Sequence, residues 1–258
     1  MDKIIILGGG ESGVGSAILA QSKGFYVFLS EKGLLKDEYK EELVCRNIPF
    51  EEGGHTKEII LSATEIIKSP GIPGTVPLVQ EAIQNNIPVI SEIEFAGRYT
   101  SAKKICITGS NGKTTTTSLI YHILKSAGLN VGLGGNIGKS FARQVAENNF
   151  DYYVLELSSF QLENMYDFKA DIAIVLNITP DHMDRYDHDM QKYVDAKMRI
   201  IRNQTDGDAF IYLAEDPILG KEIEKLILQA RIYPFAGHKM DGVAAYAENN
   251  EIIINTSK

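Results

Sequence analysis

The chain has 258 residues, 44% of them hydrophobic, and a formal net charge of −8 at pH 7. This length allows two domains of ordinary size, and the acidic balance argues against non-specific binding to nucleic acid or to an anionic membrane. The two cysteines, Cys45 and Cys106, lie far apart, which disfavours a disulfide scaffold and fits a reduced, cytoplasmic protein. The opening apolar run is too short for a signal peptide or a membrane span.

The first thirty residues predict a parallel βαβ unit with a glycine-rich turn. Its expected elements are a strand at 4–7, a helix at 14–23 and a strand at 26–29. Gly8, Gly10 and Gly13 form G-x-G-x-x-G, a spacing that lets a phosphate approach the positive end of a helix, and Glu31 is placed to hydrogen-bond a ribose. This pattern alone leaves three alternatives: a turn that needs glycine for its conformation only, a nicotinamide dinucleotide site, or a site for another diphosphate-linked nucleotide.

A polar and basic stretch at 96–104 separates this region from a second alternation of strands and helices. We therefore expect one domain at 1–96 and a second at 97–258, the latter an α/β domain with a mainly parallel sheet. Its expected elements are strands at 104–108, 151–159, 171–182 and 209–216, helices at 115–127, 190–204 and 216–230, and a hairpin about 249–250.

The stretch "ITGSNGKTTTT", residues 107–117, lies between an expected strand and an expected helix, where a phosphate-binding loop is found. Lys113 would reach the terminal phosphates of ATP, and the hydroxyl of Thr114 would bind Mg²⁺. Backbone amides from 110–114 would hold the phosphate oxygens. Ile107 stands where the common Walker pattern has glycine, so the motif is a shorter variant. The expected ATP-binding residues are Gly109, Ser110, Asn111, Gly112, Lys113, Thr114 and Thr115.

Mg²⁺ on a hydroxyl group needs carboxylate support. Glu156 is a candidate, because an acidic residue in an apolar strand is costly unless it is paired or bound to metal. A second candidate is the stretch "TPDHMDRYDHD", 179–189, which follows another apolar strand at the end where parallel sheets bind ligands. A solvated acidic loop is the alternative for that stretch.

Taken together, these stretches resemble the Mur ligases, ATP-dependent amide-forming enzymes of peptidoglycan precursor synthesis. The resemblance rests on the phosphate loop, "SPGIP" (69–73), "GGNIG" (134–138), "LELSSFQLE" (155–163) and "NITPDHMDRY" (177–186). The later segments look most like the family member that joins D-glutamate to UDP-N-acetylmuramoyl-L-alanine. The resemblance implies an N-terminal Rossmann-like domain with a parallel sheet, followed by a P-loop ATPase-type α/β domain.

The resemblance also implies a mechanism, in which ATP phosphorylates the substrate carboxylate and the amine of D-glutamate attacks the acyl phosphate. Lys113, His182 and Lys197 would be catalytic. Two Mg²⁺ ions would be bound by Thr114, Glu156, His182 and Lys197, the lysine as a carbamate formed with CO₂. The residues implied to bind the UDP-linked substrate are Gly10, Ser12, Glu31, Lys32, Gly71, Asn136 and Gln161.

Members of this family carry a third domain, which supplies contacts to D-glutamate and closes over ATP. The sequence shows no counterpart of it, so we expect a monomeric fragment of the ligase with an incomplete, inactive site. Two other functions stay open at this point. A nicotinamide-dinucleotide-dependent oxidoreductase would use the first glycine loop but leaves Lys113 unexplained, and a non-catalytic nucleotide-binding module would use both loops without turnover.

Overall fold

A five-stranded, wholly parallel sheet occupies the N-terminal part of the chain, with strand order β3-β2-β1-β4-β5. The computed structural model describes residues 2–255. The strands of this sheet are β1 (Lys3–Leu7), β2 (Tyr26–Ser30), β3 (Phe50–Glu51), β4 (Glu65–Lys68) and β5 (Val89–Ser91). The accompanying helices are α1 (Glu11–Ser22), α2 (Asp37–Cys45), α3 (Lys57–Ile60), α4 (Pro77–Gln84) and α5 (Glu92–Gly97).

A second, eight-stranded sheet follows, in the order β13-β12-β11-β10-β9-β6-β8-β7, and only the β12–β13 pair is antiparallel among the strands described. Its strands are β6 (Lys103–Thr108), β7 (Val131–Gly135), β8 (Tyr152–Glu156), β9 (Ile172–Val175), β10 (Ala209–Leu213), β11 (Arg231–Ala236), β12 (Ala245–Glu248) and β13 (Glu251–Ile254). Its helices are α6 (Lys113–Ser126), α7 (Phe141–Glu147), α8 (Ser159–Leu162), α9 (Met190–Met198), α10 (Pro217–Glu224) and the 3₁₀ turns η1 (Met183–Tyr186) and η2 (Arg199–Ile201).

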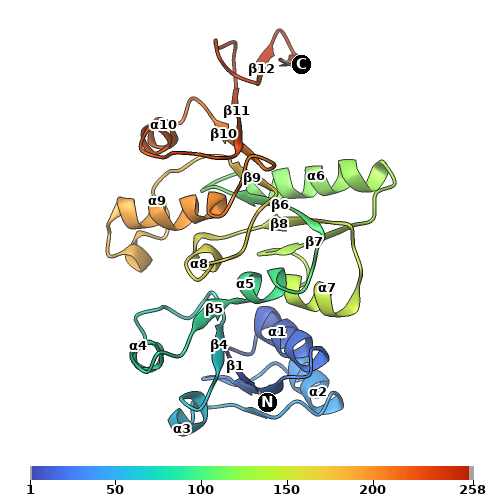
Figure 1. The fold of residues 1–258 in the computed structure, drawn as a ribbon, viewed down its shortest axis with the longest axis vertical. Coiled ribbons are helices and arrows are strands. Elements are labelled where there is room, and N and C mark those ends of the chain that lie inside the picture. The colour runs from blue at the N-terminus through green and yellow to red at the C-terminus, as the bar shows by residue number, and fades with distance from the viewer. Residues whose placement is uncertain (1, 256–258) are drawn as a thin grey trace.

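The two sheets are joined through helices α1, α5 and α7, which lie between them (Figure 1). Gly15 of α1 permits this contact, because a Cβ atom there would lie 1.8 Å from the hydroxyl oxygen of Ser140 at the start of α7. One continuous apolar cluster includes Val14 and Leu19 from the first unit and Phe141 and Tyr153 from the second. The two units therefore share a buried core, and residues from both can line one cleft.

The structure confirms the mainly parallel α/β architecture, and the hairpin turns at Asn249 and Asn250, both with positive φ. Several expected bounds were wrong. Helix α1 begins three residues earlier than expected and α6 two residues earlier, because each helix starts within its glycine loop. Helix α9 ends at Met198 and continues only as a 3₁₀ turn, and α10 ends at Glu224. The strands expected at 151–159 and 171–182 end earlier, at Glu156 and Val175. Within the second unit, the sequence analysis missed β7, α7, α8 and β11.

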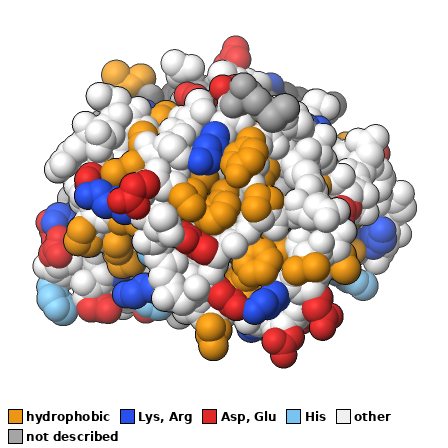
Figure 2. Space-filling model, turned by 90° about the horizontal axis from the view of Figure 1, so that it is seen from below, with side chains coloured by type: hydrophobic (Ala, Val, Ile, Leu, Met, Phe, Trp, Pro, Cys, Tyr) orange, Lys and Arg blue, Asp and Glu red, His pale blue; other side chains and the backbone are white. Residues whose placement is uncertain are grey.

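The surface carries charges of both signs. On the face of the first unit shown in Figure 2, acidic and basic side chains alternate around apolar ones. Within residues 2–255, no helix combines the length and the hydropathy that a bilayer-spanning segment requires.

Candidate functional site

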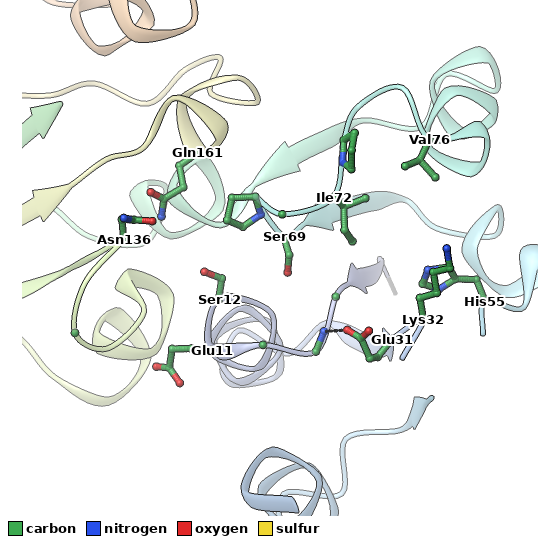
Figure 3. A pocket seen from close by; sticks show the side chains of 18 residues that line it. Glu11, Ser12, Glu31, Lys32, His55, Ser69, Ile72, Val76, Asn136 and Gln161 are labelled. Carbon is green, nitrogen blue, oxygen red and sulfur yellow. Dashed lines mark hydrogen bonds between the residues drawn. The ribbon is translucent and has the colours of Figure 1, made fainter. Parts of the chain in front are cut away.

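A cleft of about 670 Å³ opens where the strand order of the first sheet reverses, between β1 and β4. Open α/β sheets bind ligands outside the carboxyl ends of strands at such a point. Gly8 follows β1 and Ser69 follows β4, and both line the cleft (Figure 3). The structure brings together here all seven residues that the resemblance implied for the UDP-linked substrate: Gly10, Ser12, Glu31, Lys32, Gly71, Asn136 and Gln161.

The N-terminus of helix α1 forms the floor of this cleft. The first helical hydrogen bond runs from Val14 to Gly10, and no described residue accepts from the amides of 10–13. Gly13 lets the turn close, because a Cβ atom there would lie 1.9 Å from the carbonyl oxygen of Gly8. Four free amides at the positive end of a helix suit an anionic group such as a diphosphate.

Glu11 lies at the start of this helix, but its carboxylate is bonded to residues of the second unit and not directed at the free amides. It accepts hydrogen bonds from the backbone amide of Ser140 at 2.9 Å and from Nε of Arg143 at 3.0 Å. Figure 3 shows the side chain pointing away from the wall that contains Ser69 and Ile72. Arg143, which the sequence analysis did not identify, therefore neutralises the acidic residue beside the predicted phosphate position.

Glu31 has a structural role that the sequence did not reveal. Its two carboxylate oxygens accept from the amides of Gly9, at 2.6 Å, and Gly33, at 2.7 Å. It thus ties the glycine loop to the loop after β2, and each of its oxygens keeps one further acceptor position. A ribose contact by Glu31 stays a prediction.

The opposite wall of the cleft, the segment 69–73, is held by two cations. Nζ of buried Lys68 donates to the carbonyl oxygen of Ile72 at 2.6 Å, and the Arg185 guanidinium donates to the carbonyls of Pro70 at 3.4 Å and Ile72 at 3.3 Å. Burial lowers the pKa of Lys68 to about 8, although the carboxylate of Glu163 opposes the shift. The wall is therefore fixed from both units, since Arg185 comes from the second.

The loop between β6 and α6 presents a second set of free amides. No described residue accepts from the amides of 112–115, and the first helical bond of α6 runs from Thr116 to Gly112. The amides of Ser110 and Asn111 are already bonded to the backbone oxygen and the side-chain oxygen of Asn177. Of the amides expected to hold phosphate oxygens, those of Ser110 and Asn111 anchor the loop to Asn177 and those of 112–114 are free. The phosphate contacts stay a prediction.

Two lysines converge on this loop. Nζ of Lys113 donates to the carbonyl oxygens of Gly109 and Ser110, both at 2.9 Å, and Nζ of Lys197 donates to Gly109 at 2.8 Å. Lys197 is only 2% exposed and lies over the ring of Tyr193. Burial, followed by the charge of Lys113, lowers the pKa of Lys197 to about 7. A substantial fraction of its amine is therefore neutral and nucleophilic at neutral pH.

One carboxylate connects the loop to the cleft. Glu156, at the end of β8, accepts from the hydroxyl of Thr114 at 2.7 Å through one oxygen and from the side-chain amide of Asn136 at 2.8 Å through the other. It is 1% exposed. Strand β8 pairs with β6 so that Glu156 is beside Ile107, just before the loop. Glu156 therefore links the two predicted ligand sites, with one hydrogen bond to each.

His182 is less tightly placed. Its side chain is 58% exposed, Nε2 lies 3.6 Å from a carboxylate oxygen of Asp181, and its ring contacts Phe160. Nothing in the described part of the chain joins His182 to Glu156, and residues 2–255 contain no cluster of three or more histidine, cysteine or acidic side chains arranged to bind a metal. The structure thus brings Thr114, Glu156 and Asn136 together but leaves His182 apart from them.

Comparison with known proteins finds a matching family profile for each of the two units. The family profile described as Mur ligase middle domain matches residues 107–256, and that described as MurD N-terminal domain matches residues 3–76. The chain is 62% identical to a UDP-N-acetylmuramoylalanine–D-glutamate ligase of Bacteroides thetaiotaomicron over 98% of its own length and 57% of the relative's. It is 57% identical to the ligase of that name from Porphyromonas gingivalis, over 97% and 56% of the two lengths. The chain thus spans a little over half the length of these relatives.

Solved structures show the same fold at low identity. A UDP-N-acetylmuramate:L-alanyl-gamma-D-glutamyl-meso-diaminopimelate ligase from Neisseria meningitides superposes with a TM-score of 0.65 at 18% identity, covering 94% of this chain and 82% of that one. A UDP-N-acetylmuramate–alanine ligase from Thermotoga maritima gives 0.57 at 20% identity, covering 95% and 54%. Because the middle-domain profile covers more than half of the chain, and the fold and the two adjoining loops agree with it, this chain belongs to the Mur ligase family.

Proposed function

We propose that this chain carries the UDP-substrate site and the ATP phosphate site of a ligase that adds D-glutamate to UDP-N-acetylmuramoyl-L-alanine. The observation that carries the proposal is the Glu156 bridge, which joins Thr114 of the phosphate loop to Asn136 of the cleft. A ligase of this kind must bring a substrate carboxylate to the terminal phosphate of ATP, and two separate nucleotide sites would have no need of such a connection. The names of the relatives support the choice of substrates.

The chemistry follows from that placement. A carboxylate oxygen of the substrate attacks the γ-phosphorus, ADP leaves, and an acyl phosphate forms. The amine of D-glutamate then attacks the acyl carbon, loses a proton, and phosphate leaves as the amide forms. Negative charge accumulates where the two anions meet, so cationic and amide donors are needed there. Lys113 and the free amides of α6 are the donors that this chain supplies.

The donor set suits Mg²⁺ rather than a metal that needs a complete protein cage. Mg²⁺ is commonly bound by one or two protein oxygens together with phosphate oxygens and water. The adjoining oxygens of Thr114 and Glu156 provide such a partial set. We propose that they bind one ion and that His182 and Lys197 contribute to a second. The Mg²⁺ ions would neutralise charge on the transferred phosphoryl group.

Lys197 suits the proposed carbamate because its buried amine has a pKa near neutrality. A neutral amine adds to the carbon of CO₂ and loses a proton, which gives an anionic carbamate whose oxygens can bind a metal ion. An unmodified ammonium at this position would repel a divalent cation. ¹³C NMR of the folded protein in ¹³C-labelled bicarbonate, compared with Lys197→Ala under the same conditions, would detect the carbamate carbon at this lysine.

We propose a domain boundary at 96–97, within the last turn of α5, because this helix lies between the two sheets. The cleft and the phosphate loop are built by one copy of the chain, so the proposal invokes a monomer. The dependence on ATP favours the cytoplasm, where that nucleotide is made. Contacts to the adenine and to D-glutamate are not assigned to any residue of this chain.

Thermal unfolding with added ligands tests the proposal. A ligand at one hundred times its dissociation constant stabilises a protein by about 2.7 kcal/mol. We expect UDP-N-acetylmuramoyl-L-alanine and ATP with Mg²⁺ each to raise the melting temperature. Lys113→Ala should remove the ATP shift and keep the UDP-substrate shift, because Lys113 lies at the phosphate loop and not in the cleft.

The matched control is Lys125→Ala, at the last turn of the same helix and away from the loop. It should keep both shifts. Loss of both shifts in Lys113→Ala, or of neither, would contradict the assignment of two distinct sites. NADH that raises the melting temperature where the UDP-linked substrate does not would instead favour an oxidoreductase.

A further inference from the structure

One end of the cleft contains a histidine that the sequence analysis missed. His55 lies beside Lys32 at the end opposite Asn136 and Gln161 (Figure 3). Asn136 connects to the phosphate loop, so the end near Asn136 must receive the reacting carboxylate. The free amides of α1 lie between the two ends. A ligand with its diphosphate on α1 and its carboxylate near Asn136 therefore places its nucleoside at the end with His55.

His55 belongs to a chain of hydrogen bonds that leads away from the cleft. The hydroxyl of Ser30, which is fully buried, donates to a carboxylate oxygen of Glu51 at 2.6 Å. The same hydroxyl oxygen lies 2.6 Å from Nδ1 of His55. Glu51 also accepts from the amide and the hydroxyl of Thr56. The side chain of Glu51 is thus the acceptor in each of these hydrogen bonds.

Counting protons along this chain determines the tautomer of His55. Burial alone would raise the pKa of Glu51, but hydrogen bonds from Ser30 and Thr56 outweigh it and hold that pKa below its usual value. Glu51 is therefore an ionised acceptor, and the single proton of the Ser30 hydroxyl points to it. Nδ1 of His55 must then supply the proton in its contact with Ser30. The neutral imidazole consequently carries a lone pair on Nε2, on the side of the ring away from Ser30.

We propose that Nε2 of His55 accepts a hydrogen bond from the nucleoside of the ligand, and that the pair Ser30 and Glu51 fixes the tautomer that makes this possible. The donor is the imide N–H of uracil or a ribose hydroxyl. In the residues described, Nε2 has no other hydrogen-bond partner. This inference rests on the proposed function, because it names one contact of the UDP-linked substrate.

Two measurements test it. The first is ¹⁵N NMR of the imidazoles in the wild-type protein and in Ser30→Ala. We expect the proton of neutral His55 on Nδ1 in the wild type, and a change toward the Nε2–H tautomer in Ser30→Ala, since that tautomer is the one usually favoured in water. A wild-type spectrum with the proton on Nε2 would overturn the proposal without any reference to ligand binding.

The second measurement is calorimetric titration with UDP, CDP, 2′-deoxy-UDP and 3′-deoxy-UDP. His55→Phe keeps an aromatic ring but has no acceptor, and we expect it to bind UDP about 3- to 10-fold more weakly, as a lost hydrogen bond implies. Ser30→Ala should weaken UDP binding similarly although its imidazole remains. The control His122→Phe removes an exposed histidine on α6 and should bind UDP as the wild type does.

The ligand series identifies the donor. Cytosine has an acceptor where uracil has the imide N–H, so a base contact predicts that His55→Phe loses the preference for UDP over CDP. A ribose contact predicts that one deoxy-UDP binds the wild type as weakly as UDP binds His55→Phe, with the UDP-to-CDP ratio unchanged. Equal UDP affinity in the wild type and His55→Phe would contradict this inference alone. A wild-type protein that binds no UDP would contradict the proposed function and the inference together.

Discussion

Arg143→Met is expected to lower the free energy of unfolding by about 2–4 kcal/mol, because it removes the buried cation that Glu11 and Glu42 share where the two units meet. Arg143 of α7 is buried, and its guanidinium bonds Glu11 of α1 through Nε and Glu42 of α2 through both terminal nitrogens. Hydrogen bonds from Arg143 are the main cause of the lowered pKa of Glu42. The expected loss lies below the full cost of breaking a buried pair, because both carboxylates keep some contact with water. Urea denaturation measures it.

Arg46→Met is the matched control. Arg46 belongs to the same charge network, with contacts to Glu42 and Glu147, but more than a third of its side chain is exposed. Its replacement should cost no more than about 1 kcal/mol. Equal losses in the two variants would show that burial of Arg143 is not what stabilises the interface.

Arg143→Met should also bind UDP more weakly than the wild type does. Without the Arg143 cation, the carboxylate of Glu11 would place negative charge beside the free amides of α1. Adding Glu11→Gln to Arg143→Met should recover affinity while stability stays low. Calorimetric titration of UDP against the single and double variants separates the electrostatic effect from the structural one. No recovery in the double variant would argue against a neutralising role.

The elements that the sequence predicted best are those whose signal is local. The first βαβ unit and the strand before the phosphate loop are short apolar runs followed by glycine, and the final hairpin has two asparagines, which tolerate positive φ. The missed strand β7 reads "VGLGG", a composition typical of a loop. It is extended because it pairs with β8, and its Gly132 and Gly134 leave room for Gln144 of α7. That requirement is tertiary and leaves no pattern in the strand itself.

The sequence likewise predicted which residues gather at the candidate site, but not the contacts that hold them there. All seven implied substrate residues meet at one cleft, because loops at the carboxyl ends of parallel strands converge. The sequence could not reveal that Glu31 bonds to backbone amides, nor that Ser110 and Asn111 are anchored by Asn177, because these partners depend on the path of each loop. His55 belongs to no recognisable sequence motif. Its contact with Ser30 forms only because β3 pairs with β2 in the folded sheet.

Glu92→Gln is expected to stabilise the protein increasingly as the pH rises. Glu92 of α5 is 2% exposed, one of its carboxylate oxygens accepts from the amide of Ala142, and the other has no hydrogen-bond partner among the residues described. Burial raises its pKa from 4.5 to about 7, although the Ala142 amide opposes the shift. The folded protein therefore keeps a proton that the unfolded chain releases, and this contribution to stability is complete below pH 4.5 and is lost as the pH rises through 7.

The size of the effect follows from the two pKa values. Between pH 5 and pH 8 the wild type should lose about 2–3 kcal/mol of unfolding free energy relative to Glu92→Gln, whose amide oxygen keeps the bond to Ala142 and does not titrate. Urea denaturation of both proteins across this range measures the difference. Other titrating groups are common to the two proteins, so their contributions cancel in the comparison.

Glu94→Gln, on the same helix, separates burial from the lack of partners. Glu94 is as deeply buried as Glu92, but one of its oxygens accepts from the amides of Tyr166, Asp167 and Phe168. Its other oxygen lies 3.5 Å from the guanidinium of Arg98. Its replacement by the neutral amide weakens three hydrogen bonds to a charged acceptor and should lower stability by about 1–3 kcal/mol. The two substitutions are chemically identical, so opposite signs at pH 8 would show that the partners of a buried carboxylate, amides and the Arg98 cation together, decide whether it stabilises this interface. A difference between wild type and Glu92→Gln that stays constant from pH 5 to pH 8 would mean that Glu92 is ionised throughout, with a partner supplied by solvent.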